Sequence, residues 1–244
     1  MLNQIRKYII KALNNIYKNH GEKMSEYDFE IICKPSYSLL KFKLNNQEIM
    51  TETGSMVYMD PKISIETSAK GGVLGVLKRA VVGESVFMNK LKGNGVLALA
   101  PACSGDIAHH ELNGTLYASS GAYLASSPHL SIDTKFGGTK TFFGGQGLFL
   151  MKIEGKGDVF LSAYGALEEI ELNNESIIVD NGHLVAFTSG LEYSLGKLGG
   201  LKSALLGGEG LVYTFKGTGK VYIQTRNIQS FVGFISPYLP KTSQ

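Results

Sequence analysis

A pattern of asparagine and glycine residues occurs three times along the chain and constrains its fold more than any other feature. Each copy opens with Leu-Asn-Asn or Leu-Asn-Gly and continues with a lone glycine, a Gly-Gly pair and a closing Gly-X-Gly run. The opening triplets are residues 44–46, 112–114 and 172–174, and the lone glycines are Gly54, Gly121 and Gly182. The Gly-Gly pairs are residues 71–72, 137–138 and 199–200, and the closing Gly-X-Gly runs are residues 93–95, 155–157 and 217–219. The near-constant spacing predicts a structural unit of about 60 residues that is present in triplicate, longer than the repeats of solenoid proteins.

The residues between these landmarks alternate with period two and are rich in Val, Ile, Phe, Tyr and Leu, which is typical of an all-β protein. The Asn-Asn and Asn-Gly pairs predict hairpin turns. Joining copies in one chain would cover the edge strands of each β unit, so we expect a pseudo-threefold arrangement, with linear packing as the alternative. The predicted divisions are a helical extension (1–23) and β repeats at 24–105, 106–166 and 167–238.

Composition narrows the class of protein. The chain has 244 residues, of which 43% are hydrophobic and 18% charged, and this excludes disorder. The formal net charge of +3 comes from the first 23 residues, which carry five basic residues and one acidic residue; the rest of the chain is close to neutral. We therefore do not expect nucleic acid as a partner. Two cysteines without CxxC spacing indicate a reducing compartment, and we expect a cytoplasmic protein.

The first 20 residues predict an amphipathic helix. Leu2, Ile5, Ile9, Leu13 and Ile16 follow the helical period, and Gly21 suits the end of such a helix. The helix could pack on the body of the protein, pack on a neighbouring subunit, or lie on anionic lipid.

Four stretches resemble the altered-inheritance-of-mitochondria twenty-four family. They are Gly-Glu-Ser-Val-Phe at 83–87, Val-Asp-Asn-Gly-His-Leu-Val-Ala-Phe at 179–187, Gly-Gly-Glu-Gly-Leu-Val at 207–212 and Gln-Thr-Arg-Asn at 224–227. The resemblance covers residues 27 to 236. It implies three tandem β-sandwich domains of double-stranded β-helix type, similar to the tryptophan RNA-binding attenuation protein. The mitochondrial relatives are associated with the inner membrane, and the family has no catalytic motif to transfer.

The glycine-rich segments in the middle of each copy also carry basic residues beside apolar ones, which suits a membrane surface or a subunit interface. The alternative is that these segments are strands of the core, with their basic residues at the rims of the strands. The candidate contact residues are Leu74, Leu77, Lys78, Arg79, Phe136, Lys140, Phe142, Leu198, Lys202 and Leu205.

Possible catalytic or metal-binding groups are sparse. Asp106, His109, His110 and Glu111 are the densest cluster, but adjacent histidines on a strand point to opposite faces and would not share one metal. His183 follows the glycine of copy three and is expected to be a hydrogen-bonded turn residue rather than a specialised site. Glu168, Glu169 and Glu171 are expected to be solvated. We expect no enzyme activity, no metal and no cofactor.

These observations favour a non-catalytic scaffold protein that forms homo-oligomers and contacts a membrane peripherally. The alternative is a module that binds a small ligand or nucleic acid in clefts between the repeats, for which the ligand is unknown. A metal-dependent enzyme using His109 and His110 is the third hypothesis.

Overall fold

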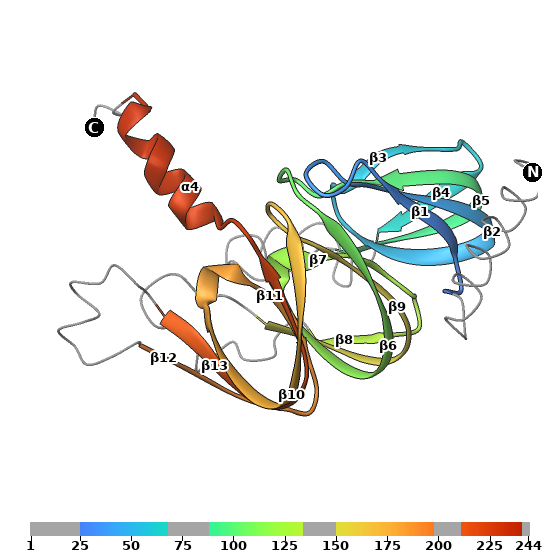
Figure 1. Cartoon of the computed structure of the whole chain (residues 1–244). Coiled ribbons are helices and arrows are strands. Elements are labelled where there is room, and N and C mark those ends of the chain that lie inside the picture. The colour runs from blue at the N-terminus through green and yellow to red at the C-terminus, as the bar shows by residue number, and fades with distance from the viewer. Residues whose placement is uncertain (1–24, 68–87, 134–149, 198–210, 241–244) are drawn as a thin grey trace, which may run out of the picture.

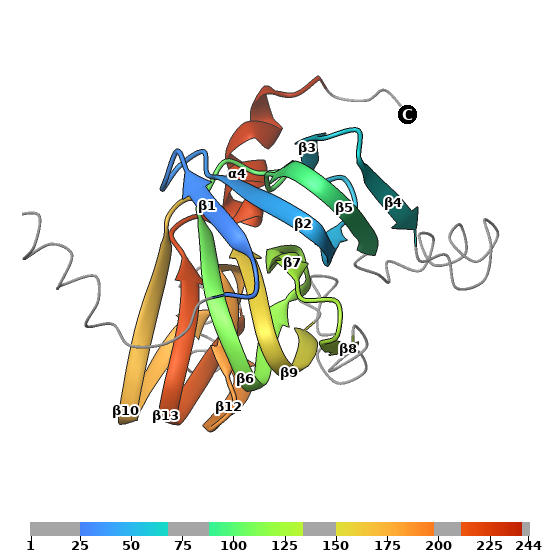
Figure 2. The ribbon, with the colours of Figure 1, turned by 90° about the vertical axis from the view of Figure 1, so that its right-hand side faces the viewer.

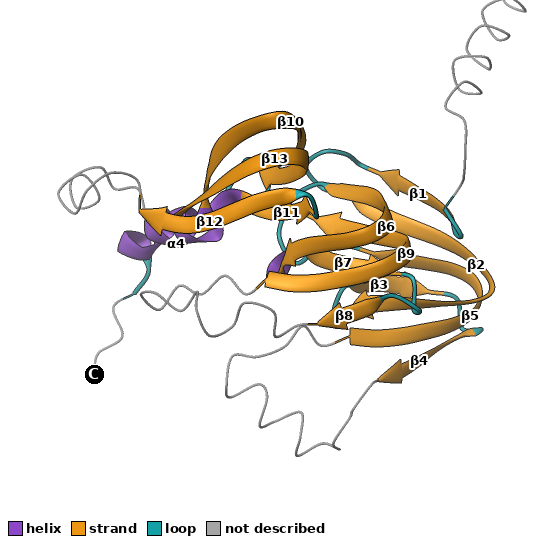
Figure 3. Cartoon of the chain, turned by 90° about the horizontal axis from the view of Figure 1, so that it is seen from below, coloured by secondary structure: helices purple, strands orange, loops and turns teal. Residues whose placement is uncertain are grey.

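The computed structural model describes residues 25–67, 88–133, 150–197 and 211–240, and within these ranges the chain is mostly β-strand. The strands are β1 (Asp28–Ile32), β2 (Leu39–Glu52), β3 (Met56–Met59), β4 (Ile63–Thr67), β5 (Met88–Leu99), β6 (Ile107–Ser119), β7 (Tyr123–Ser126), β8 (Ser131–Asp133), β9 (Leu150–Ser162), β10 (Leu167–Asp180), β11 (Leu184–Thr188), β12 (Leu191–Lys197) and β13 (Leu211–Gln224). The helix α4 (Ile228–Ile235) follows the last strand (Figures 1 and 3). The prediction of an all-β protein is confirmed.

One pairing pattern occurs three times among these strands. In each consecutive set of four, the first and fourth strands are long and pair antiparallel along their length. The second strand pairs with the C-terminal half of the fourth, and the third strand pairs with its N-terminal half. These sets are named unit one (β2–β5), unit two (β6–β9) and unit three (β10–β13), and β1 pairs with β2 beside unit one. Figure 1 shows the units following one another in chain order.

Each later unit joins the preceding one through its second strand. β7 pairs with β2 at the first junction, and β11 pairs with β6 at the second junction. The sheet order is β10-β13-β11-β6-β9-β7-β2-β5-β3, and Figure 2 shows the long strands of units two and three side by side. Among the described residues β10 and β3 are the end strands. The sheet is therefore open, and its ends do not pair with each other to complete the pseudo-threefold arrangement.

The asparagines that open each copy lie inside long strands, so the prediction of hairpin turns there is wrong. Asn46 and Asn174 have positive φ angles of 52° and 55° where β2 and β10 each carry an extra residue. The Gly-X-Gly runs lie opposite, in β5 and β13. A Cβ atom at Gly93 would lie 2.2 Å from the carbonyl oxygen of Lys62, so glycine is required for β4 to lie this close. The repeat thus marks irregular points inside paired strands rather than strand ends.

The described residues form three apolar clusters, and adjoining units interlock through them. The cluster of unit one includes Leu124 and Ala125 from β7, and the cluster of unit two includes Val185 and Ala186 from β11. The cluster of unit three is built from its own strands and Leu150 of β9. Each of the first two cores is therefore completed by the second strand of the unit that follows.

Two predictions fall on parts of the chain outside the described residues. One is the amphipathic helix in residues 1–23. The other is the set of candidate contact residues in the glycine-rich segments, all of which lie within 68–87, 134–149 and 198–210.

Candidate functional site

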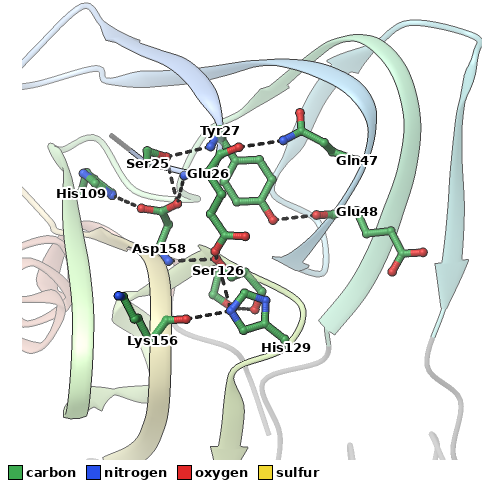
Figure 4. A network of polar contacts seen from close by, with 11 residues as sticks. Ser25, Glu26, Tyr27, Gln47, Glu48, His109, Ser126, His129, Lys156 and Asp158 are labelled. Atoms are coloured by element: carbon green, nitrogen blue, oxygen red, sulfur yellow. Dashed lines mark hydrogen bonds and ion pairs between the residues drawn. The ribbon is translucent and has the colours of Figure 1, made fainter. Parts of the chain in front are cut away.

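A buried carboxylate, that of Asp158 on β9, is the centre of the polar network at the first junction (Figure 4). Its Oδ1 lies 2.6 Å from Nε2 of His109 on β6. Its Oδ2 accepts from the hydroxyl of Ser25 at 2.9 Å and from the backbone amide of Glu26 at 2.8 Å. The network therefore fastens the segment before β1 to unit two.

A second layer of contacts surrounds this carboxylate. The hydroxyl of Ser127 donates to Oε1 of Glu26 and accepts from the backbone amide of Asp158. The hydroxyl of Tyr27 donates to the carbonyl of Glu48 at 2.6 Å, which ties the same segment to β2. Burial raises the pKa of Tyr27, so its hydroxyl remains a donor at neutral pH. Units one and two are thus held together by hydrogen bonds as well as by strand pairing.

The arrangement of Ser25, His109 and Asp158 does not match a nucleophilic triad. Ser25 and His109 both bind the Asp158 carboxylate, whereas a triad requires the serine to bind the histidine. Burial alone would raise the pKa of Asp158, but the hydrogen bonds from His109, Ser25 and the Glu26 amide outweigh burial and lower it. The carboxylate is therefore a charged acceptor, and His109 donates to it from Nε2.

The neighbouring histidine faces the opposite way, as strand alternation predicts. Nδ1 of His110 lies 2.8 Å from the hydroxyl of Tyr222 on β13, in unit three. Burial, assisted by the nearby charge of Lys220, lowers the pKa of His110 to about 4, so its ring is neutral at physiological pH. His109 and His110 thus serve different contacts. Within the described residues no cluster of three or more His, Cys, Asp or Glu side chains is arranged to hold a metal ion.

Of the other acidic residues singled out from the sequence, Asp106 and Glu169 have side-chain partners, and Glu111, Glu168 and Glu171 are exposed. Oδ1 of Asp106 accepts from the hydroxyl of Ser38 at 2.9 Å, which links unit two to unit one. Glu111 is exposed on β6, and Glu169 pairs with Lys220 at 2.6 Å on the surface of unit three. Glu168 and Glu171 are exposed on β10, as expected.

A groove of about 480 Å³ lies where α4 leaves unit three. Its lining residues are Tyr164, His183, Thr225, Arg226, Asn227, Ser230, Phe231 and Phe234. Both ring nitrogens of His183 are engaged, Nδ1 with the carbonyl of Gln224 at 2.6 Å and Nε2 with the side-chain amide of Asn227 at 3.0 Å. Since Nε2 accepts from the amide, Nδ1 carries the proton. His183 is therefore a hydrogen-bonded turn residue that positions the start of α4.

The helix α4 begins at this hydrogen-bonded turn and extends away from the strands (Figure 1). The side-chain oxygen of Asn227 accepts from the amide of Ser230 at 2.7 Å and caps the helix. The ring of Phe231 meets the ring of Tyr164 edge-on, with centroids 6.1 Å apart. Beyond this contact the helix has no buried residues.

The surface of α4 and the turn after it is strongly apolar. Phe234 is 69% exposed and Tyr238 is 80% exposed. The other large exposed apolar side chains of this segment are Ile228, Phe231, Val232 and Leu239. Soluble proteins rarely leave so many such residues uncovered in one place, so the segment is the strongest candidate contact surface in the described part of the chain.

Sequence reasoning missed this helix, although the residues carry a signal for it. Asn227 is a favoured N-cap, Ile228, Phe231, Val232 and Ile235 recur at helical spacing, and Pro237 follows the last turn. Because the helix is short, its apolar pattern is easily taken for that of a final β-strand. α4 has eight residues and is too short to cross a membrane. No helix in the described ranges has the length and apolar character that crossing requires.

Comparisons with known proteins give one consistent result. A family model described as mitochondrial biogenesis AIM24 matches residues 29–226. An uncharacterized protein of Streptococcus pyogenes serotype M6 is 33% identical, over 93% of this chain and 98% of its own length. A crystal structure of a Streptococcus pyogenes protein, 30% identical, superimposes with a TM-score of 0.72 and covers 88% of this chain and all of its own. These relatives carry no named activity.

Proposed function

The chain belongs to the mitochondrial biogenesis AIM24 family, and on that premise we propose that it is a non-catalytic scaffold protein. It associates with itself and rests on a membrane surface through α4. The observation that carries the proposal is the exposed apolar surface of α4 and the following turn. Such a surface is stable in water only if something covers it or if the helix lies at an apolar boundary.

The residues around α4 favour lipid over an acidic or basic protein surface. Phe234 and Tyr238 are aromatic and exposed, which suits the boundary between headgroups and acyl chains. The sequence from 211 to 244 contains no Asp or Glu, and Arg226 and Lys241 flank the helix. An anionic lipid surface would therefore meet no negative side chain of this segment, and the two cations would attract it.

The arrangement of polar side chains supports the non-catalytic part of the proposal. Asp158 and His109 satisfy each other, His110 binds Tyr222, and His183 binds Asn227 and the Gln224 carbonyl. These contacts hold units, turns and α4 in place. A catalytic base would instead aim a free nitrogen or oxygen into a cavity that admits a substrate.

For the architecture, we propose that the three units are tandem β-sandwich domains similar to the tryptophan RNA-binding attenuation protein. The threefold recurrence of one pairing pattern supports this, as does the recurrence of the same junction. The proposed location is the cytoplasm, at the periphery of a membrane.

Flotation of the full chain with phosphatidylglycerol-containing vesicles tests the membrane contact. The wild-type chain should float with anionic vesicles, and the double variant Val232→Ser, Phe234→Ser should remain at the bottom of the gradient. The variant Ile65→Ser is the matched control, because Ile65 is an exposed isoleucine on β4, far from α4 in the sequence. Equal flotation of the double variant, or no flotation of the wild-type chain, would rule out the proposed role of α4.

A small-ligand binding module is the second candidate, and the groove beside α4 favours it. Arg226 provides a positive charge there, and Tyr164 and Phe231 provide ring surfaces. Saturable binding of a small anionic aromatic probe that is lost in Arg226→Gln, with flotation unchanged, would favour this function over the membrane contact.

A further inference from the structure

The groove beside α4 has a floor of fixed geometry. The segment after β13 lies against the turn between β9 and β10: the amide of Arg226 donates to the carbonyl of Tyr164 at 3.2 Å. The amide of Ala166 donates to the hydroxyl of Thr225 at 2.9 Å. Gly165 has a φ of 80°, and a Cβ atom there would lie 2.5 Å from the Thr225 hydroxyl and 3.0 Å from Cγ of Arg226. Glycine is therefore required at this turn, and it lets the stem of Arg226 pack closely on the backbone.

The polar residues of this groove are specific to unit three. Counting from the closing Gly-X-Gly runs places Arg226 with Ala102 of copy one and Tyr164 of copy two. Counting from the lone glycines places His183 with a serine and an alanine. The earlier units form the same strand pairing with uncharged residues at these positions, so the pairing does not require a guanidinium or an imidazole here. The groove is therefore a feature that unit three adds to the repeated fold.

The lining of the groove suits a negative charge. Arg226 is exposed, and only its Nη1 is used, to donate to the carbonyl of Thr225 at 2.9 Å, so the guanidinium keeps further N–H groups for a ligand. The described residues that line the groove include no Asp or Glu. Ser230 adds a hydroxyl from the first turn of α4, where the helix dipole also favours negative charge. The groove therefore favours an anion whose oxygen atoms accept several hydrogen bonds.

One wall of the groove is part of the apolar surface of α4. Phe231 and Phe234 line the groove, and they are 45% and 69% exposed. Because the ring of Phe231 also meets that of Tyr164, apolar surface runs from the floor of the groove to the exposed side of the helix. A free inorganic anion would use only the polar floor, and a hydrocarbon would use only the wall. The ligand that matches both is an amphiphile with an anionic head and an apolar tail.

We propose that this groove binds the headgroup of an anionic phospholipid such as phosphatidylglycerol. Arg226 binds the phosphate oxygens with two N–H groups, as a guanidinium does with phosphate, and the acyl chains lie along Phe234 and the exposed side of α4. The volume of about 480 Å³ suits a phosphoglycerol group, whereas a lone carboxylate would fill little of it. A phosphocholine group is less suitable, because its quaternary ammonium would lie near the positive charge of Arg226.

This inference deepens the proposed membrane contact and rests on it for its role. Contact through α4 alone depends on apolar surface and on the general negative charge of the membrane. A headgroup site beside the helix adds selection for a lipid that carries a phosphate without a cation. It also orients unit three on the membrane, because the groove and the helix then contact neighbouring parts of one lipid molecule.

The test measures binding of dihexanoyl phosphatidylglycerol to the full chain by isothermal titration calorimetry, below the concentration at which this lipid forms micelles. The wild-type chain should bind it saturably, and should bind glycerol 3-phosphate and dihexanoyl phosphatidylcholine at least about tenfold more weakly. Arg226→Gln should raise the dissociation constant by more than about tenfold, because the phosphate loses charge-assisted hydrogen bonds. Arg226→Lys should recover only part of this loss, since lysine keeps the charge without the planar fork. Lys216→Gln removes an exposed cation of β13 outside the groove and should bind like the wild type.

Several results would overturn the inference. They are no saturable binding by the wild-type chain, an unaffected Arg226→Gln variant, equal weakening in Lys216→Gln, which would indicate general charge attraction, and equally tight binding of glycerol 3-phosphate or octanoate, which would indicate a free phosphate ester or a carboxylate as the ligand. Flotation separates this inference from the membrane proposal. A chain that floats but does not bind the short-chain lipid contacts membranes through α4 without a headgroup site. A chain that binds the short-chain lipid but does not float has the headgroup site without the proposed contact through α4.

Discussion

The two junctions within the chain use the same backbone pairing and different side-chain chemistry. At the first junction the cross-strand partners are Met50 with Ser126 and Thr51 with Ala125, and the Asp158 network fastens the units beside them. At the second junction Tyr117 faces Phe187, and their rings stack with centroids 4.9 Å apart. Phe187 also packs against Tyr193 and Phe215, each at 4.9 Å.

This difference shows which part of a repeated unit is constrained. The strand register must be kept because a shift of one residue would turn every apolar side chain to the wrong face. The side chains at the junction need only fill the space and satisfy their polar atoms, so a charged network and a ring cluster serve equally well. The first junction should therefore depend on charge, and the second on ring packing.

Replacing Asp158 should give the largest loss of stability. Asp158→Ala is expected to lower the free energy of unfolding by about 3–5 kcal/mol, because His109, Ser25 and the Glu26 amide lose a buried acceptor. Urea unfolding measures the change. Glu111→Ala is the control, since Glu111 is the exposed cross-strand partner of Asp158, and it should change stability by less than about 0.5 kcal/mol. Equal effects of the two variants would show that the network does not stabilise the first junction.

Glu52 should give the first junction a distinctive pH dependence. Burial raises the pKa of Glu52 to about 7 from an ordinary value of 4.5, so the folded state holds a proton that the unfolded state releases. Stability should therefore fall as the pH rises from 4.5 to 7. Glu52→Gln should remove this loss and exceed the wild type by about 2–3 kcal/mol above pH 7, with little difference below pH 4.5. Parallel unfolding curves for the two proteins across this range would contradict the assignment.

His110 should give the second junction the opposite dependence. Its pKa of about 4 lies below the ordinary value of 6.5, so the unfolded state takes up the proton first and stability falls as the pH drops from 6.5 to 4. The expected loss is about 2–3 kcal/mol. His110→Asn should be less stable at neutral pH, because Tyr222 loses its partner, but should lose no further stability over this acid range through this position. Urea midpoints at matched pH values measure both effects.

Ring packing at the second junction should contribute less than the buried charge. Phe187→Leu is expected to cost about 1–2 kcal/mol, since leucine keeps much of the volume but loses the contacts with Tyr117, Tyr193 and Phe215. Phe234→Leu, the same change on exposed α4, should be neutral in thermal unfolding. If Phe187→Leu were also neutral, the ring cluster would only fill space, and the contrast between the junctions would disappear.

The all-β class could be predicted because alternation and glycine spacing are local features of the sequence. The opposite orientation of His109 and His110 could be predicted for the same reason, since it follows from strand geometry alone. The Asp158–His109 contact could not, because it joins residues 49 positions apart and depends on the register of β6 with β9. The hairpin turn predicted at Asn46 was wrong, because β2 continues past this residue. Asn46 is an extra residue in β2 opposite Gly93 and Asn94 of β5, and this pairing cannot be seen from the local sequence.

The smallest expected effect comes from Tyr213, whose hydroxyl differs from that of Tyr222 in having no hydrogen-bond partner among the described residues. Tyr213 and Tyr222 are both buried on β13, but the hydroxyl of Tyr222 binds His110, whereas that of Tyr213 has no hydrogen-bond partner among the described residues. Burial raises the pKa of Tyr213 to about 12, so its hydroxyl keeps its proton. Tyr213→Phe removes an unsatisfied polar atom and should be neutral or stabilising by up to about 1 kcal/mol.

Tyr222→Phe makes the same chemical change and should instead cost about 1–2 kcal/mol, because it leaves Nδ1 of His110 unpaired at the second junction. Chemical denaturation of the two variants beside the wild type measures the difference between a tyrosine that fills a core and one that joins two units. Equal effects would mean that the His110–Tyr222 contact adds nothing to the ring packing. The second junction would then be held by apolar contacts alone, and its contrast with the charged first junction would be greater.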